Sequence, residues 1–287
     1  MSTTLRLLRS HHVRPRKQYG QSFLTEDHIF RKIVAVGDLS PEDTVVEIGS
    51  GLGVMTRMLA NVAAKIIAVE IDPHLTDILR NDLKDTENIE IVQQDIRTCD
   101  LSEFVPRAPT GKIKVMGNIP YNITSEILFH LIKFRNSISD AVLLMQQEVA
   151  ERLVAGPGTK AYGIPSVIFS MFSDLEILFP VSNRCFYPKP AVQSAVLRLV
   201  FLDTPRFSLE DEAFFRLLVR AAFARRRKTL LNNLKVFREY GKNLDETRAI
   251  LADLGIDGSR RAETLSSKEF ADLANALALS DLRGPLS

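Results

Sequence analysis

The sequence predicts an α/β protein in which a mainly parallel sheet, covered by helices on both faces, is followed by a small all-helical domain. Short β-branched runs alternate with helical patterns from about residue 44 to 146, as in parallel sheets. A glycine loop, Gly49-Ser50-Gly51-Leu52-Gly53, directly follows the first of these runs. Beyond Asp203-Thr204-Pro205 only helical patterns remain, so a domain boundary is expected there.

The alternating segments are assigned from their residue types. Apolar runs rich in valine and isoleucine predict buried strands, and apolar residues recurring every three or four positions predict helices. The expected strands are 44–48, 65–70, 89–92, 112–116 and 141–145, and the expected helices are 54–63, 73–83 and 123–134. Pro73 suits the first turn of its helix, where no hydrogen bond from the main-chain nitrogen is needed.

After residue 146 the pattern becomes less regular. Helices are expected near 148–154 and 165–172, on either side of a glycine-bearing loop at 156–163. Strands at 175–179 and 194–201, separated by a long irregular segment, are expected to join the edge of the sheet as a hairpin-like unit. Helices at about 210–224, 227–240, 244–254 and 267–279 follow. We therefore expect two domains, 1–203 with a basic N-terminal arm and 204–287.

Composition excludes several classes of protein. Hydrophobic residues make up 45% of the chain and charged residues 25%, as in ordinary globular proteins. No apolar run is long enough to cross a bilayer, and the N-terminus lacks the apolar centre of a secretory signal. Cys99 and Cys185 lie far apart and the five histidines are scattered, so neither a disulfide framework nor a metal site is expected. A cytoplasmic protein without membrane or metal partners is expected.

The net charge of +2 conceals two basic clusters. The first 25 residues carry five cations, among them Arg16 and Lys17, and no acid precedes Glu26. The second cluster is the run Arg225, Arg226, Arg227 and Lys228. Basic clusters often contact phosphate backbones, although a solvated face or a disordered tail would have the same composition.

The glycine loop predicts a site for a nucleoside-like ligand. Ligands of open parallel sheets bind at the carboxyl ends of the strands, where glycines such as Gly49 and Gly51 let the backbone approach them closely. The spacing G-x-G-x-G departs from the dinucleotide fingerprint, and no P-loop lysine pattern is present. Glu70, at the end of the second strand, can accept ribose hydroxyls, and Asp95, after the third, can accept from an adenine amine.

These acids, together with Glu47 before the loop, favour a cationic ligand without phosphates, and S-adenosylmethionine is such a ligand. Alternatively, the glycines merely form a turn and Glu70 is a surface acid. That alternative leaves unexplained why these positions all fall at the same edge of the predicted sheet.

Asn118-Ile119-Pro120-Tyr121 follows the fourth strand and is expected to face the same crevice. The Asn118 amide and the Pro120 carbonyl would accept the hydrogens of an exocyclic amine and orient its lone pair. Tyr121 offers a face for stacking, and Phe186 a second one, although Phe186 could equally anchor the core beneath a proline turn. Because a base within a helix cannot reach such a pocket, a single-stranded or flipped nucleotide is implied.

Six segments together resemble the ribosomal RNA adenine N6,N6-dimethyltransferases, and most closely their small-subunit (KsgA or RsmA) branch. They are Gln18–Leu24, Glu47–Gly53, Asn118–Asn122, Leu153–Pro157, Lys160–Gly163 and Phe186–Ser194. The resemblance implies a Rossmann-like, class I S-adenosylmethionine-dependent methyltransferase domain with a seven-stranded sheet. It also implies dimethylation of two adjacent adenosines in the 3′-terminal hairpin loop of small-subunit rRNA, within a pre-30S particle, by a monomer.

Carried over by position, the resemblance implies roles for individual residues. The cofactor contacts would be Ser22, Leu24, Gly49, Glu70, Asp95 and Asn118, and the catalytic residues around the target adenine Asn118, Pro120, Tyr121 and Phe186. Both basic clusters would contact rRNA. The family usually has asparagine where this chain has Ser22, so a shorter or water-mediated cofactor contact is expected there.

Two other functions fit the same resemblance. The erythromycin-resistance branch methylates one adenosine of large-subunit rRNA, but the segments 156–163 and 224–229 are more similar to the small-subunit enzymes. The chain could instead serve mainly as an RNA-binding assembly or transcription factor, as mitochondrial relatives do. Methyl transfer to undermethylated small subunits distinguishes these alternatives.

Overall fold

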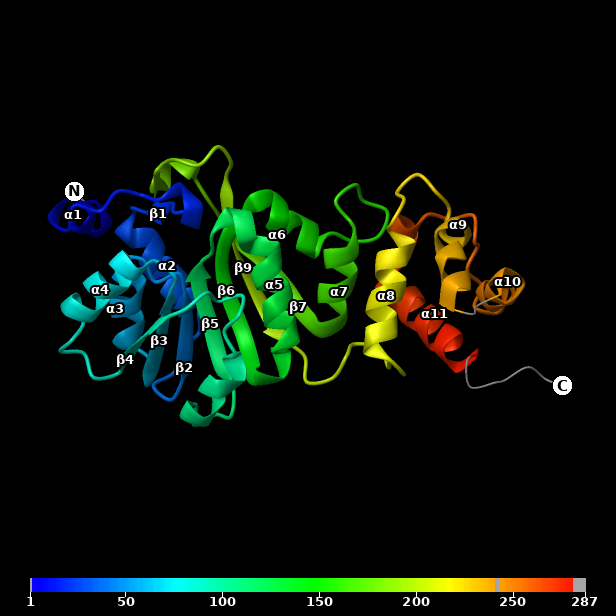
Figure 1. The fold of residues 1–287 in the computed structure, drawn as a ribbon, viewed down its shortest axis with the longest axis horizontal. Helices are drawn as coiled ribbons and strands as arrows, with labels where there is room; N and C mark the ends of the chain where they lie inside the picture. Colours follow the sequence, from blue (N-terminus) through cyan, green and yellow to red (C-terminus); the bar gives the residue numbers. More distant parts are fainter. Residues whose placement is uncertain (1, 241–242, 281–287) are drawn as a thin grey trace. The chain divides into compact units, whose positions relative to one another are not determined.

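The computed structural model describes residues 2–240 and 243–280. The chain forms two compact units (Figure 1). The first comprises Met1–Ala150 and Leu175–Phe201, and the second Glu151–Asp174 and Leu202–Ser287. Residues 151–174 thus group with the C-terminal helices, whereas the sequence suggested one division at 203/204. The assignment of functions to the two predicted domains stays a prediction. The last residues of the predicted second domain, 281–287, lie outside the described residues.

The first unit is built on a seven-stranded sheet in the order β4-β3-β2-β5-β6-β9-β7. Its strands are β2 (Thr44–Ile48), β3 (Lys65–Glu70), β4 (Ile89–Gln93), β5 (Ile113–Asn118), β6 (Ile138–Gln146), β7 (Ser173–Val181) and β9 (Ser194–Phe201). The first five pair in parallel, and β9 pairs antiparallel with β6. The mostly parallel seven-stranded sheet that the sequence and its family resemblance predicted is therefore confirmed, and the two late strands lie at its edge.

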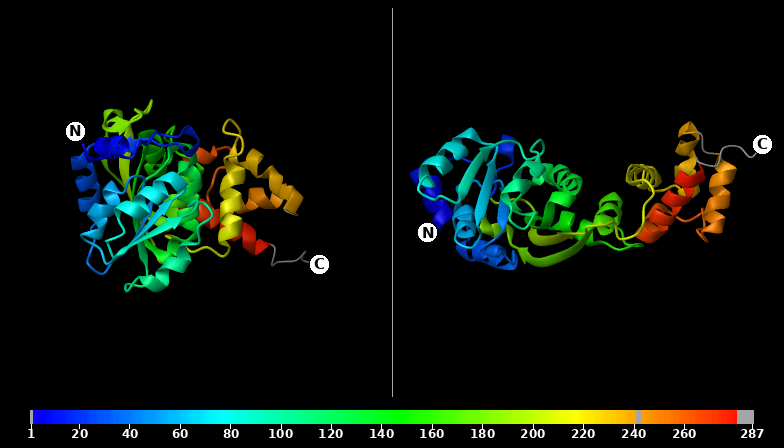
Figure 2. Two further views of the ribbon diagram at one scale, coloured as in Figure 1. Left: turned by 60° about the vertical axis from the view of Figure 1, so that its left-hand side comes forward. Right: turned by 90° about the horizontal axis from the view of Figure 1, so that it is seen from below.

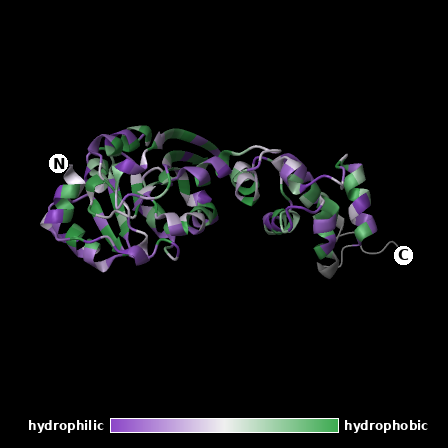
Figure 3. Cartoon of the chain, turned by 90° about the horizontal axis from the view of Figure 1, so that it is seen from above, coloured by the Kyte–Doolittle hydropathy of each residue, from purple (hydrophilic) through white to green (hydrophobic). Residues whose placement is uncertain are grey.

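The strands are apolar because helices cover both faces of the sheet (Figures 1 and 2). Every residue of β2 is buried, and the strands are largely hydrophobic in Figure 3, whereas the helices alternate in hydropathy. The chain moves from β2 to β3 on one side and returns to β5 on the other. The carboxyl end of β2 is therefore the switch point at which ligands of such sheets bind.

Helices follow the strands as expected. They are α3 (Val54–Ala60), α4 (Pro73–Asp82), α5 (Thr124–Lys133) and α6 (Gln147–Val154). Pro73 lies in the first turn of α4, and the Asp72 carboxylate caps that helix by accepting from the His74 N–H.

Two N-terminal helices were not predicted: α1 (Thr3–Ser10) and α2 (Asp27–Val36). Ser2 caps α1, and its buried Leu8 belongs to a small apolar cluster that also contains Val13 and Leu75. The basic arm is therefore folded against the first unit. A two-residue strand, β1 (Phe23–Leu24), pairs antiparallel with β8 (Phe186–Tyr187) and so joins two segments of the family resemblance.

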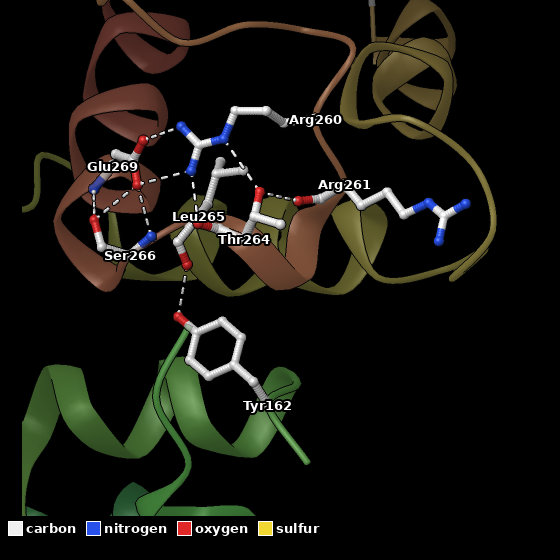
Figure 4. Close-up of polar contacts among 7 residues, drawn as sticks. All are labelled: Tyr162, Arg260, Arg261, Thr264, Leu265, Ser266 and Glu269. Atoms are coloured by element: carbon white, nitrogen blue, oxygen red, sulfur yellow. Dashed lines mark hydrogen bonds and ion pairs between the residues drawn. The ribbon is translucent and has the colours of Figure 1, made fainter. Parts of the chain in front are cut away.

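The second unit contains α7 (Ile164–Phe172), α8 (Glu212–Ala222), α9 (Leu230–Leu234), α10 (Leu244–Asp253) and α11 (Ser267–Ser280). Instead of one helix over 227–240, α9 ends at Leu234 and a 3-10 helix follows, Lys235–Tyr240. The loop at 156–163 is bound to this unit, because the Tyr162 hydroxyl donates to the Leu265 carbonyl at 2.8 Å (Figure 4). Within the described ranges, no helix is long and apolar enough to span a membrane.

Candidate active site

A hollow opens at the carboxyl ends of β2, β3, β4 and β5. Eight of the predicted site residues line it: Ser22, Gly49, Gly51, Glu70, Asp95, Asn118, Pro120 and Tyr121. Topology has thus brought together five segments that are distant in sequence.

The glycine loop forms one wall of the hollow in a conformation that requires glycine. Gly49 and Gly51 have φ angles of +71° and +58°, which side chains rarely adopt. The Gly51 N–H donates to Glu70 Oε2 at 2.9 Å. The loop is therefore fixed to the end of β3.

Glu70 and Asp95 lie at the ends of neighbouring strands but differ in environment. Glu70 is 5% exposed, and burial raises its pKa. Its Oε1 accepts from the Asp72 N–H at 2.9 Å. Asp95 is paired with Arg97, whose side-chain hydrogen bonds lower the Asp95 pKa, and Arg97 also bridges to Glu126. Both carboxylates are thus held in place by neighbouring donors.

The Asn118 side chain has a defined orientation. Its Nδ2 donates to the Ser22 carbonyl at 3.0 Å, so Oδ1 remains the atom that can accept a hydrogen bond. The Ser22 hydroxyl donates to the Pro188 carbonyl at 3.0 Å. Ser22 therefore connects the N-terminal segment to Asn118 through its main chain and to the loop after β8 through its side chain.

The Pro120 carbonyl is already hydrogen-bonded. It accepts from the Ile123 N–H at 3.3 Å and from Thr124 Oγ1 at 3.0 Å, which uses both lone pairs. The Tyr121 hydroxyl is hydrogen-bonded to Ser194 Oγ, and burial raises the Tyr121 pKa. This turn is consequently rigid before any ligand binds.

Two predicted site residues, Leu24 and Phe186, are not among those lining the hollow. They lie opposite each other in the β1–β8 pair, are 1% and 4% exposed, and pack in the main apolar core. The other facing pair is Phe23 and Tyr187; Phe23 lines the hollow and Tyr187 is 50% exposed. Tyr187 does not line the hollow, and only the register of this short pair shows which of the two aromatic residues faces outward.

Glu47 does not line the hollow either, contrary to its interpretation as an acid near the ligand. It is 1% exposed and accepts a hydrogen bond from Thr56 Oγ1. Burial raises the pKa of Glu47 to about 8, although the hydrogen bond from Thr56 acts in the opposite direction. The group is thus mostly neutral at pH 7 and contributes to the structure beneath the loop.

We expect Glu47→Gln to remove a pH dependence of stability. A carboxyl with a raised folded-state pKa stabilises the fold fully below its unfolded pKa of about 4.5, and this contribution is lost as the pH rises towards about 8. The free energy of unfolding of wild type minus that of the variant should therefore fall between about pH 5 and about pH 8, by up to about 1.4 kcal/mol per unit. Denaturant unfolding at several pH values measures this difference. A difference that does not change with pH would show that Glu47 ionises normally.

The predicted phosphate contacts lie in both units. Arg16 Nη1 is 2.9 Å from Asp72 Oδ1, whereas Lys17 is exposed. Arg225, Arg226, Arg227 and Lys228 are all exposed on the second unit. Arg226 also donates to the Lys160 carbonyl at 3.0 Å. Across the described ranges, no group of three histidine, cysteine or acidic residues could hold a metal ion.

Comparison with known proteins identifies the family. The model of the family described as ribosomal RNA adenine dimethylase matches residues 12–279. The ribosomal RNA small subunit methyltransferase A of Syntrophus aciditrophicus is 44% identical over 98% of this chain and 100% of that protein. The protein of the same name from Enterococcus faecalis is 42% identical over 96% of this chain and 95% of its own.

Two solved structures share the fold. A dimethyladenosine transferase from Plasmodium falciparum superposes with a TM-score of 0.74 at 24% identity, covering 88% of this chain and 95% of that one. The 23S rRNA methyltransferase ErmE has a TM-score of 0.67 at 26% identity, covering 89% and 99%. With its sheet, glycine loop and Asn118 turn, the chain belongs to the ribosomal RNA adenine dimethylase family.

Proposed function

We propose that this chain transfers methyl groups from S-adenosylmethionine to the N6 amines of two adjacent adenosines in the 3′-terminal hairpin loop of small-subunit rRNA. The observation that carries the proposal is that the glycine loop, Glu70 and the Asn118 amide face one hollow. The relatives named as small-subunit methyltransferases match nearly the whole chain. The substrate would be a pre-30S particle in the cytoplasm, and the chain would act on it as a monomer.

The charges around the hollow suit this methyl donor. Among the described residues, its lining contains the carboxylates Glu70 and Asp95 but no lysine, arginine or histidine. Such a lining disfavours a phosphate-bearing nucleotide and favours a cationic nucleoside, because these residues offer no positive charge to neutralise phosphate. Glu70 would accept the ribose hydroxyls, Asp95 would accept from the adenine amine, and Gly49 and Gly51 would allow close approach of the backbone.

The residues of the Asn118 turn would align the acceptor amine. When bound, S-adenosylmethionine supplies an electrophilic methyl group. Asn118 Oδ1 would accept one hydrogen of the target amine and direct its lone pair, and Tyr121 would support the ring. The proton would leave the methylated nitrogen after transfer, so the protein needs no general base before attack.

A single side-chain acceptor suits two successive transfers to the same nitrogen. After the first transfer the amine has one hydrogen left, and Asn118 alone can accept it. The Pro120 carbonyl is engaged by Ile123 and Thr124. A second acceptor in the first transfer would therefore come from a rearranged turn or from the carbonyl of Ile119, a residue that also lines the hollow.

Methylation of small subunits lacking this modification tests the proposal. Primer extension on the 3′ end of their rRNA should show stops at two adjacent adenosines after incubation with protein and S-adenosylmethionine. Modification of large-subunit rRNA alone would instead support a 23S rRNA methyltransferase, as ErmE is named. Tight binding to small subunits without any transfer would support a non-catalytic assembly factor.

The second aromatic face at the target base is open to a direct test. The β1–β8 register directs Tyr187 outward and Phe186 into the core. We expect Tyr187→Ala to weaken binding of the rRNA substrate by about fivefold to a hundredfold, with little change in melting temperature. Phe186→Ala should instead lower the free energy of unfolding by about 3 kcal/mol. If Phe186→Leu, with stability preserved, lowers the affinity for substrate more than Tyr187→Ala does, Phe186 reaches the base.

The basic run is expected to contact rRNA phosphates. Replacing Arg225 and Arg227 together by glutamine should reduce the slope of log affinity against log salt by roughly 1.5, because fewer counterions are released. Arg226 is left intact because it also binds the Lys160 carbonyl. Arg248→Gln, which removes a cation paired with Asp245 on the same unit, is the control. An unchanged slope in the double variant would contradict the assignment.

A further inference from the structure

Besides the bond between Ser22 and Asn118, the buried Asp72 carboxylate also holds the N-terminal segment beside the hollow. The Asp72 side chain is 2% exposed. Arg16 Nη1 donates to its Oδ1 at 2.9 Å, and Gln21 Nε2 donates to its Oδ2 at 2.8 Å. The Arg16 N–H in turn donates to Gln21 Oε1 at 2.7 Å, which closes a ring of hydrogen bonds.

The same carboxylate residue is connected to the glycine loop. The Asp72 N–H donates to Glu70 Oε1, and the Gly51 N–H donates to Glu70 Oε2, both at 2.9 Å. Glu70 is thereby held between the loop and Asp72, and Asp72 is held by Arg16 and Gln21. A continuous set of hydrogen bonds thus runs from the N-terminal segment to the wall of the hollow.

We propose that Arg16 and Gln21 are positioning residues for the methyl-donor site, acting through Asp72 on Glu70 and the glycine loop. This inference rests on the proposed function, because it assigns Glu70 to the donor. It gives Arg16 a role that its position in a basic arm does not suggest, since its guanidinium is paired with a buried acid of the first unit.

Charge balance supports this role. Glu70 and Asp72 are buried, and Asp72 disfavours the ionised form of Glu70. The Arg16 guanidinium is hydrogen-bonded to Asp72, and its positive charge offsets part of this repulsion. The Arg16 side chain is 45% exposed, so solvent weakens the pair and a moderate effect is expected.

The arrangement also couples donor binding to the order of the N-terminal segment. Residues 19–23 line the hollow, and Arg16 and Gln21 hold this stretch against the end of β3. A ligand that contacts residues 19–23 binds most tightly when the stretch is already in place, because no ordering cost then remains. Weakening the bond between Arg16 and Asp72 should therefore weaken donor binding, although Arg16 does not itself line the hollow.

Calorimetric titration with S-adenosylmethionine, in the absence of RNA, tests the proposal on the full-length protein. We expect Arg16→Gln and Gln21→Leu each to weaken donor binding by about threefold to tenfold. The double variant should lose less than the product of the two, since both residues act through Asp72. Arg16→Lys, which keeps the charge, should restore part of the affinity. Arg14→Gln removes an exposed arginine two residues upstream and is the matched control.

A second measurement requires no ligand. Amide hydrogen exchange at Gly51 and Asp72, whose N–H groups bind Glu70, should be faster in Arg16→Gln than in wild type and unchanged in Arg14→Gln. Faster exchange in a protein that does not bind the donor at all would retain the positioning role and refute the proposed function. If Arg16→Gln binds the donor within twofold of wild type and its amide exchange is unchanged, the inference is wrong. If that variant also binds RNA more weakly, Arg16 acts as a phosphate contact instead.

Discussion

Replacing Asn118 by alanine is expected to lower the rate of methyl transfer at least about a hundredfold while leaving S-adenosylmethionine affinity within about tenfold. The Asn118 Oδ1 atom is proposed to accept from the target amine, an interaction that matters most as the nitrogen becomes tetrahedral. Its Nδ2 only holds the side chain against the Ser22 carbonyl. Single-turnover transfer at saturating donor, combined with calorimetric donor titration, separates the two effects.

Asn118→Asp is the informative companion variant. It keeps an acceptor oxygen but cannot donate to the Ser22 carbonyl, so the side chain loses its fixed orientation. We expect its transfer rate to lie between those of wild type and Asn118→Ala. Loss of donor binding with normal turnover at saturating donor would contradict the assignment of Asn118 to the acceptor amine.

Gly117→Ala is expected to lower the free energy of unfolding by about 3 kcal/mol. A Cβ atom at Gly117 would lie 2.6 Å from the Ile48 carbonyl oxygen and 3.1 Å from the Ile48 Cβ. Both neighbours belong to β2, which pairs with β5 at this point, so neither can move without disturbing the sheet. Because Asn118 is the next residue, transfer should fall together with stability.

The melting temperature measures this effect, and a decrease of roughly 6 to 12 °C is expected. Gly156→Ala is the matched control, since a Cβ there meets nothing within 4 Å and the backbone is not strained. Equal melting temperatures for wild type and Gly117→Ala would show that β2 and β5 can separate enough at this point to admit a methyl group.

The sequence was sufficient for features that depend on local pattern. The β-branched runs at 44–48 and 65–70 form strands as predicted, because the apolar residues that define the sequence pattern are also the residues that the sheet buries. The glycine loop and Asn118 were placed at the same edge correctly, because the loop follows β2, Asn118 ends β5, and parallel strands end at one edge of a sheet.

Features that depend on strand register or on partners distant in the chain could not be predicted from the sequence. Which of Phe186 and Tyr187 points outward depends on pairing with β1, far earlier in the chain, and that pairing leaves no local signal. The basic composition around Arg16 gave no sign that its guanidinium pairs with Asp72, which is distant in sequence, and its contact with rRNA phosphates stays a prediction. Glu47 was expected near the ligand because it directly precedes the glycine loop, but its side chain is buried and bonded to Thr56.

The contact between Asn118 and Ser22 has an evolutionary consequence. The Asn118 amide is oriented by a main-chain oxygen, which every residue type possesses. Either serine or asparagine at position 22 can therefore orient Asn118, the side chain proposed to align the acceptor amine. A site whose orienting acceptor is a main-chain oxygen tolerates a change of side chain at that position. Serine at position 22, where the family usually has asparagine, is therefore compatible with an intact enzyme.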